Sequence, residues 1–316
     1  MRRLLLITND NAGTSDDEPI EAAVTVLREG AEVEVVGTSD LDELKDVLRE
    51  RLDAHPETEV VVAGGDGSLH AMIVALGALD RLHREDGSGP EAPALGLIPL
   101  GTGNDFARSI DLPTEPAEAA RVVLDGKLRP IDVIEDDTGA LIVNAVHVGA
   151  GEEAGRAAQP WKERLGPIGY VIGSVLAGIQ AKGWRLRVVI DGTAVTDGRQ
   201  RLMQVAIANG TSVGGGAQIA PEAAPGDGRA DVLIASARGR FEQLRYALRL
   251  KRGDQDELDG VRNYVGREVR ISTTGEPFGI NADGELSDPV RERTWRVLRA
   301  AYRLHVPAGE DPGVRS

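Results

Sequence analysis

Residues 60–70 read VVVAGGDGSLH, and three kinds of local structure follow one another along them. Residues 60–63 form a continuous apolar run, which is typical of a β-strand buried on both faces. Residues 64–67, Gly-Gly-Asp-Gly, end the run in a turn, and apolar residues then recur at helical spacing at Leu69, Met72, Ile73, Leu76 and Leu79. This order puts backbone N–H groups and a helix N-terminus at the carboxyl end of a strand. Phosphate binds well there, because glycine allows close approach and the helix end carries partial positive charge.

Asp66 is the unusual member of this turn, because a carboxylate repels a phosphate unless a cation lies between them. A Mg²⁺ ion at Asp66, or a role for Asp66 in deprotonating an attacking hydroxyl, would resolve the conflict. The alternative is a plain tight turn in which Ser68 caps the following helix. This turn alone leaves both interpretations open.

A second glycine-rich turn follows the next predicted strand. Residues 96–100 (GLIPL) indicate a strand, and residues 101–108 (GTGNDFAR) follow it directly. Elsewhere in the first half of the chain, apolar strands also alternate with single amphipathic helices, which predicts βαβ units and a parallel sheet. Two glycine-rich turns after neighbouring strands would line one crevice at the carboxyl edge of that sheet.

The two turns together resemble the diacylglycerol kinase catalytic domain, which bacterial lipid kinases, sphingosine kinases and ceramide kinases share. The family is marked by a Gly-Gly-Asp-Gly-Thr turn and a Pro-Leu-Gly-Thr-Gly-Asn-Asp-Phe-Ala-Arg segment. The second is complete at residues 99–108, and the first differs only in Ser68, which keeps the hydroxyl. The resemblance implies an ATP- and Mg²⁺-dependent kinase that phosphorylates a lipid hydroxyl, with diacylglycerol as the first candidate.

The same resemblance implies which residues contact the nucleotide. They come from the two turns and two earlier loops: Asn9, Thr38, Gly64, Gly65, Gly67, Ser68, Gly101, Thr102, Gly103, Asn104 and Asp105. In the first loop Asp10 stands where the family has proline, which adds negative charge near the nucleotide. Thr38 is expected beside the phosphates, although capping of the next helix explains it equally well.

Two acids carry the implied chemistry. Bacterial lipid kinases have an Asp-Gly-Glu whose acids face the nucleotide, and it matches residues 283–285 here. By resemblance, Glu285 is the expected base, and Asp66 is the expected metal and phosphate residue. The sphingosine kinase branch suggests Asp66 as the base instead, and the sequence leaves this open.

Two further residues are candidates for the site, Asp227 and His147. Asp227 lies in an Asp-Gly turn that helps to hold a structural Mg²⁺ in the bacterial branch, so it is the second expected metal ligand. Ala224 stands where lysine is typical, and a hairpin turn is the alternative interpretation of residues 227–228. His147 lies in a segment that matches the family, but a lone histidine on a strand is more often structural than catalytic.

Beyond residue 128 the pattern changes to short strands separated by Asp-Gly and Thr-Gly turns, which predicts antiparallel hairpins. We therefore expect an α/β protein. A parallel βαβ nucleotide-binding domain would cover residues 1–128, with a strand at about 296–307 returning to it. A mostly antiparallel, β-rich lipid-substrate domain would cover residues 129–295, with a helical region at 161–182 and a cleft between the domains.

Composition narrows the partners. At 316 residues with 41% hydrophobic and 28% charged residues, the chain is long enough for two globular domains. A net charge of −15 and only 3% aromatic residues argue against a nucleic-acid partner. The absence of cysteine excludes a disulfide framework and a cysteine nucleophile.

We expect a cytoplasmic protein with no transmembrane segment, peripheral to the inner face of the membrane, that meets its lipid substrate at the surface. A homodimer is compatible with this prediction.

Three other interpretations remain. The basic residues between 238 and 252 could dock on anionic lipid or form a solvated helix face. NAD kinases share the Gly-Gly-Asp-Gly turn, but their Asn-Glu pair and Thr-Gly-Ser-Thr-Ala-Tyr segment do not occur here. A nucleotide-binding regulator without catalysis is the other alternative, against which the complete set of acids argues.

Overall fold

The computed structural model describes residues 2–9, 17–85, 91–149, 183–236 and 260–309. The chain forms two compact units: unit 1 is Met1–Val133, Pro225–Asp227 and Leu298–Ser316, and unit 2 is Ile134–Ala224 and Gly228–Val297. The chain passes from one unit to the other within the strands β5 (Lys127–Asp136) and β18 (Glu292–Val306). The predicted helical region at 161–182 and the basic cluster at 238–252 lie outside the described residues.

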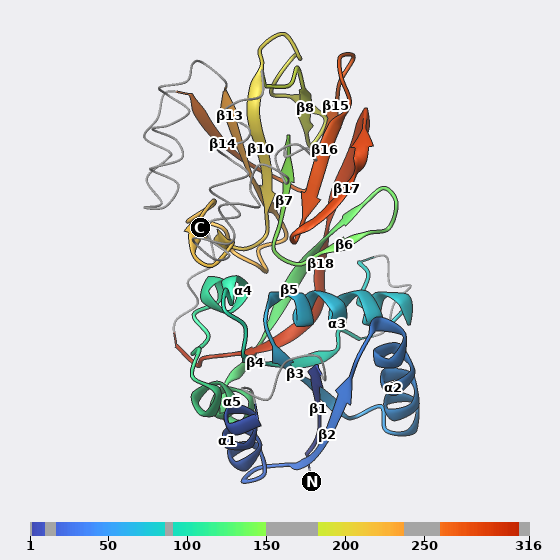
Figure 1. Cartoon of the computed structure of the whole chain (residues 1–316), viewed down its shortest axis with the longest axis vertical. Helices are drawn as coiled ribbons and strands as arrows, with labels where there is room; N and C mark the ends of the chain where they lie inside the picture. Colours follow the sequence, from blue (N-terminus) through green and yellow to red (C-terminus); the bar gives the residue numbers. More distant parts are fainter. Residues whose placement is uncertain (1, 10–16, 86–90, 150–182, 237–259, 310–316) are drawn as a thin grey trace. The chain divides into compact units, whose positions relative to one another are not determined.

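Unit 1 is the predicted succession of strands and helices (Figure 1). Its strands pair in parallel in the order β2-β1-β3-β4, and the last part of β18 adds to β4, also in parallel. The elements are β1 (Arg3–Asn9), α1 (Asp17–Leu27), β2 (Glu32–Thr38), α2 (Leu41–Ala54), β3 (Glu59–Gly64), α3 (Asp66–Ala78), β4 (Ala94–Pro99), α4 (Asp105–Ser109) and α5 (Pro116–Asp125). The parallel α/β architecture that the sequence predicts is therefore confirmed.

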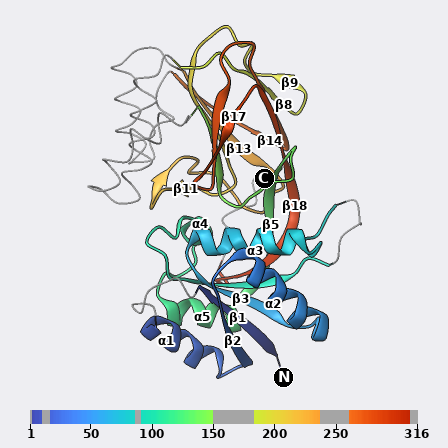
Figure 2. The same ribbon diagram turned by 45° about the vertical axis from the view of Figure 1, so that its right-hand side comes forward.

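Both faces of this sheet are covered, because successive strand side chains point to opposite faces. Leu4 and Leu6 of β1, with Val61 of β3, pack against apolar residues of α1 and α5. Ile7 and Val62 face the side that carries α2 and α3. Figure 2 shows the pair α1 and α5 and the pair α2 and α3 on opposite sides of the strands. Continuous apolar runs such as residues 60–63 are the sequence pattern of strands covered in this way.

An ionic cluster lies at the amino ends of β1 and β3. The Glu59 carboxylate accepts hydrogen bonds from Arg2 Nε at 2.8 Å and Arg2 Nη2 at 2.7 Å, and its Oε2 lies 2.7 Å from His305 Nε2. Partial burial opposes ionisation of Glu59, but the bonds from His305 and Arg2 outweigh it and lower the pKa of Glu59 to about 2. The cluster ties β18 to the sheet.

Unit 2 is built of antiparallel strands, as the hairpin pattern predicts. One sheet has six strands in the order β14-β13-β10-β7-β16-β17. These are β7 (Ala145–Val148), β10 (Leu202–Ala208), β13 (Ala230–Ser236), β14 (Val261–Gly266), β16 (Phe278–Ala282) and β17 (Glu285–Val290). The first part of β18 pairs with β15, and β15 pairs with β8. The remaining strands are β6 (Leu141–Ile142), β8 (Arg187–Ile190), β9 (Thr193–Ala194), β11 (Ser212–Val213), β12 (Ala217–Gln218) and β15 (Glu268–Ser272).

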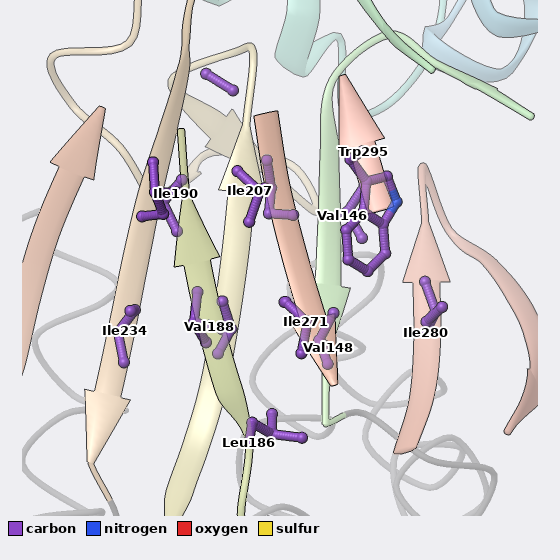
Figure 3. Packing of buried hydrophobic residues seen from close by; sticks show 14 of the residues in the cluster. Val146, Val148, Leu186, Val188, Ile190, Ile207, Ile234, Ile271, Ile280 and Trp295 are labelled. Atoms are coloured by element: carbon purple, nitrogen blue, oxygen red, sulfur yellow. The ribbon is translucent and has the colours of Figure 1, made fainter. Parts of the chain in front are cut away.

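Mostly aliphatic side chains, with the aromatic rings of Phe278 and Trp295, fill the core between the two sheets of unit 2 (Figure 3). Val146, Ile207 and Ile280 come from the six-stranded sheet, and Val188 and Ile271 come from the other. Alternate residues of each strand supply these core side chains, because successive side chains of a strand point to opposite faces of the sheet. Many of them are β-branched, which suits a pleated surface buried on one face. Trp295 of β18 is 1% exposed and packs within this layer. The hairpin turns of unit 2 connect strands that are packed in this core.

Candidate functional site

The first glycine turn opens α3 directly at the end of β3. Gly65 occupies the N-cap position of α3, and because glycine has no side chain it cannot make a capping bond. The alternative role of Ser68 as the cap of this helix is therefore wrong. Gly64 must be glycine, because a Cβ there would lie 2.2 Å from Ser68 Oγ. Gly67 is exposed and has open space around it, so the first turn of α3 is accessible.

A pocket of about 210 Å³ lies beside this helix end, at the carboxyl ends of β1, β2 and β3. Four of the residues predicted to contact the nucleotide line it: Asn9, Thr38, Gly67 and Ser68. The other lining residues are Ile7, Thr8, Ser39, Asp40, Leu41, Leu44, Val62, Ala63, Ala71 and Met72. Of the described lining residues, Asp40 alone is charged. The structure thus brings three segments of the predicted nucleotide site around one pocket in unit 1.

The two helix ends at this pocket differ in charge. The N-terminus of α2 is capped by Asp40, which accepts the N–H groups of Asp42 and Glu43 at 2.9 Å each. Glu43 in turn accepts the N–H of Ser39 at 2.8 Å. Thr38 is therefore not the cap of this helix; its hydroxyl donates to Thr8 O at 3.4 Å. The Asp40 carboxylate already accepts N–H groups at the start of α2. An anionic group at this pocket is therefore better stabilised at the uncapped end of α3.

The second glycine turn is folded by its own side chains. Asn104 has a left-handed backbone conformation, with φ of 49°, and its Oδ1 accepts the N–H of Gly101 at 3.0 Å. Arg108 Nε donates to Gly103 O at 3.1 Å. Asn104 and Asp105 are buried and Thr102 is exposed. Asn104 therefore builds the turn, a structural role that its place in the motif does not reveal.

The glycines of the two turns pack against each other. A Cβ on Gly101 would lie 2.6 Å from Gly65 Cα and 2.9 Å from Asn104 Oδ1. A Cβ on Gly65 would lie 3.0 Å from Gly101 Cα. The two contacts of a Cβ on Gly101 are too short for a side chain, so the packing of the turns requires glycine at position 101. The contact of a Cβ on Gly65 is tight, so a side chain there would force Gly101 to shift. The sequence motif predicts that these glycines admit a phosphate, and it does not reveal that they also contact each other.

Asp66 joins the two turns. Its Oδ2 accepts the N–H of Asp105 at 3.1 Å and its Oδ1 accepts the N–H of Phe106 at 2.9 Å. These two N–H groups open α4, so the half-buried Asp66 carboxylate stabilises the positive end of that helix. The negative charge of Asp66 in the first glycine turn thus has a structural partner in the protein itself.

The predicted metal ligands do not form a protein-only cage. Asp227 is half-buried in the short segment Pro225–Asp227 of unit 1. In the part of the chain that the structure describes, no three His, Asp or Glu side chains come together as metal ligands. Each Asp66 oxygen keeps a second lone pair after accepting one N–H group. Mg²⁺ commonly takes one or two carboxylates together with substrate phosphates, and a single carboxylate at Asp66 fits that arrangement.

The predicted residues of unit 2 lie on the six-stranded sheet. Glu285 is exposed at the start of β17, directly after the turn formed by Asp283 and Gly284. His147 lies on β7, and its Nδ1 is 2.8 Å from Gln204 Nε2. Desolvation lowers the pKa of His147 to about 4, so its imidazole is neutral at pH 7. This environment agrees with a structural role for His147.

Comparisons with known proteins cover almost the whole chain. Residues 3–135 match the family model of the diacylglycerol kinase catalytic domain, and residues 144–304 match that of the YegS C-terminal NAD kinase beta sandwich-like domain. Two proteins from Klebsiella pneumoniae (strain 342) and Pectobacterium atrosepticum, each named "Probable lipid kinase YegS-like", are 30% identical to this chain. Each match covers 96% of this chain and 95% of the relative.

Solved structures show the same fold. A crystal structure of a diacylglycerol kinase from Bacillus anthracis str. Sterne has a TM-score of 0.71 at 19% identity, covering 96% of this chain and 97% of that one. A second structure from the same organism has a TM-score of 0.77 at 22% identity, with the same coverage.

In the described residues, no helix is long and apolar enough to cross a membrane.

A diacylglycerol kinase catalytic domain followed by a β-sandwich defines a class of phosphotransferases that have an alcohol group as acceptor. Within that class, the chain belongs to the YegS-like family of lipid kinases.

Proposed function

We propose that this protein transfers the γ-phosphoryl group of ATP, with Mg²⁺, to the hydroxyl group of a lipid, and that the lipid is diacylglycerol. One observation in unit 1 carries the proposal. Two glycine turns follow the neighbouring parallel strands β3 and β4, Asp66 joins them, and the uncapped end of α3 opens on a pocket of about 210 Å³. Such an arrangement suits a nucleotide phosphate, and membership of a lipid kinase family supports a lipid as acceptor.

Each residue has a proposed part. The N–H groups at the start of α3 would bind phosphate oxygens, and the polar groups of Asn9, Thr38 and Ser68 would bind the remainder of the nucleotide in the pocket. Mg²⁺, when bound, neutralises charge on the transferred phosphoryl group, and Asp66 would hold it. Glu285 would take the proton of the acceptor hydroxyl, a contribution that is typically worth about 10²–10⁴-fold in rate.

The remaining expectations are part of the same proposal. The lipid would be met at the membrane surface, from the cytoplasmic side. The relatives from Klebsiella pneumoniae and Pectobacterium atrosepticum are named as lipid kinases, which supports a lipid acceptor over NAD. Homodimer formation would not alter the proposed chemistry, since the pocket and both glycine turns lie within a single chain.

Transfer of ³²P from labelled ATP tests the proposal directly. The acceptors are diacylglycerol, sphingosine and ceramide in mixed micelles, and NAD in solution, each with and without Mg²⁺. We expect labelled phosphatidic acid, only with Mg²⁺. Glu285→Gln should lower kcat by about 10²-fold or more, because an amide cannot accept the proton. Glu276→Gln, another exposed acid of unit 2, is the matched control and should stay active.

Three results would contradict the proposal. Labelling of NAD alone would identify an NAD kinase. ATP binding without transfer to any acceptor would identify a nucleotide-binding regulator. Labelling of sphingosine or ceramide in place of diacylglycerol would keep the lipid kinase and correct the substrate.

A further inference from the structure

We propose that Asp283 is a positioning residue, which orients Glu285 by fastening the β16–β17 turn to the backbone of residues 143–145. This inference rests on the proposed function, in which Glu285 is the base. Asp283 and Gly284 form the two-residue turn between Ala282 and Glu285, with φ of 49° and 95°. Two successive positive φ values are typical of a type I′ hairpin turn, which suits an Asp-Gly pair.

The Asp283 carboxylate accepts three successive backbone N–H groups. Its Oδ2 lies 2.6 Å from Val143 N, and its Oδ1 lies 3.0 Å from both Asn144 N and Ala145 N. The backbone N–H of Asp283 also donates to Ala145 O at 3.0 Å. The turn is therefore fixed by four bonds to one short segment, three of them charge-assisted and correspondingly strong.

The segment that receives the turn is itself held in place. Asn209 Nδ2 donates to Val143 O at 2.8 Å, and Asn144 Nδ2 donates to Ser212 O at 2.8 Å. Asn144 and Asn209 are both buried. Because β7 follows directly and packs into the sandwich core, residues 143–145 form a rigid anchor.

Glu285 depends on this anchor for its position. It is exposed, it follows Asp283 by two residues, and it lies on β17, the end strand of its sheet. Among the described strands, β17 pairs with β16 alone. Loosening the turn would therefore move Glu285, and a displacement of about 1 Å can lower a catalytic rate by about 10²-fold. Asp283 acts through Glu285 and needs no contact with substrate for this role.

The chain contains the same device a second time, away from Glu285. Asp191 and Gly192 form the β8–β9 turn with φ of 47° and 78°. Asp191 Oδ1 accepts the N–H groups of Arg267 at 2.9 Å and Glu268 at 2.8 Å. Thr193, not an acid, follows this turn. Asp191→Ala is therefore a matched control: like Asp283→Ala, it removes a carboxylate clamp and places alanine at a positive φ.

The experiment compares kcat, the KM for ATP, unfolding and amide hydrogen exchange in both variants. We expect Asp283→Ala to lower kcat by about 10- to 100-fold with the KM for ATP within about twofold. Exchange at residues 143–145 should accelerate. Asp191→Ala should lower stability comparably while kcat stays within about twofold. Asp283→Asn, which keeps one acceptor oxygen and tolerates positive φ, should show a smaller fall in kcat and serves if the alanine variant does not fold.

A double variant separates positioning from general damage. If Asp283 acts only through Glu285, adding Asp283→Asn to Glu285→Gln should leave kcat within about twofold of Glu285→Gln alone. Additive losses, equal losses of kcat in the Asp283 and Asp191 variants, or unchanged exchange at residues 143–145 would each overturn the inference. If the wild-type chain phosphorylates no lipid, the proposed function fails and the positioning role fails with it. An active wild type with an equally active Asp283 variant overturns the positioning role alone.

Discussion

Replacing Asp66 by alanine should destabilise unit 1 as well as abolish phosphoryl transfer. The Asp66 carboxylate accepts the N–H groups of Asp105 and Phe106, and both of those residues are buried. Alanine would leave these two N–H groups at the start of α4 without their acceptor. A residue that served only the chemistry would behave differently, because removing an active-site charge is often neutral or stabilising.

The expected size follows from the contacts. Loss of a helix N-cap destabilises a protein by about 0.5–2 kcal/mol, and hydrogen bonds to a charged group lie near the upper end of such values. Asp66 makes two of them while half-buried, so solvent screens the charge in part. We expect a loss of about 2 kcal/mol for Asp66→Ala and about half of that for Asp66→Asn, which keeps one acceptor oxygen.

Denaturant unfolding measures the loss, and amide hydrogen exchange locates it. Exchange should accelerate in α4 before it does so elsewhere in unit 1. Glu115→Ala is the matched control, since Glu115 caps α5 by accepting one N–H group, that of Glu118, at 2.8 Å. It should destabilise by less than Asp66→Ala and leave phosphoryl transfer unchanged.

The reasoning is refuted if Asp66→Ala unfolds within about 0.5 kcal/mol of the wild type and α4 exchanges at the wild-type rate. Loss of activity by itself would not distinguish a purely catalytic Asp66 from an Asp66 that also stabilises α4, since both roles predict it.

Three further predictions concern the packing of the glycine turns, the ionic cluster at Glu59 and the identity of the base. Gly101→Ala should destabilise the protein by about 1–3 kcal/mol, because its Cβ would overlap Gly65. Gly67→Ala should be neutral or slightly stabilising, because the space around Gly67 is open. Denaturant titration of both variants checks this, and equal effects would contradict it. Glu59 has a folded pKa of about 2, below its unfolded value of 4.5, so its stabilisation is present above pH 4.5 and is lost as the pH falls toward 2. Glu59→Gln should therefore lose about 3 kcal/mol at pH 7 and almost nothing near pH 2, and a pH-independent difference would refute the ionic explanation. Glu285→Gln should lower kcat without raising the Mg²⁺ requirement, whereas Asp66→Asn should raise it; the reverse pattern in kinetics with ATP and Mg²⁺ varied independently would make Asp66 the base.

Much of the fold is local in origin and could be predicted. The continuous apolar run at residues 60–63 and the glycine turn after it depend on short-range sterics and on burial, which neighbouring residues express directly. The alternation of short strands and Asp-Gly turns after residue 128 indicates hairpins for the same reason, and unit 2 is antiparallel. The two glycine turns were correctly expected after adjacent strands, since consecutive βαβ units usually pair side by side.

The helix caps were less predictable. Ser68 and Thr38 are both residue types that favour N-caps, yet Gly65 occupies the N-cap position of α3 without a side-chain bond, and Asp40 caps α2. Residue preference identifies candidates within a turn, but the backbone angles at each position choose among them. The observed N-cap positions lie three residues before Ser68 and two residues after Thr38.

The sequence by itself therefore determined the order of the elements, the parallel and antiparallel halves and the two motifs that place glycine turns at one sheet edge. Only the tertiary structure decided what the acids of those motifs contact. Asp66 reaches Phe106, 40 positions along the chain, and Asp283 reaches Val143, 140 positions away. Partners so distant are set by how sheets and turns pack, and no pattern of neighbouring residues records them. The physical reason is that a carboxylate binds whichever N–H groups the folded backbone leaves within hydrogen-bonding distance, irrespective of their place in the sequence.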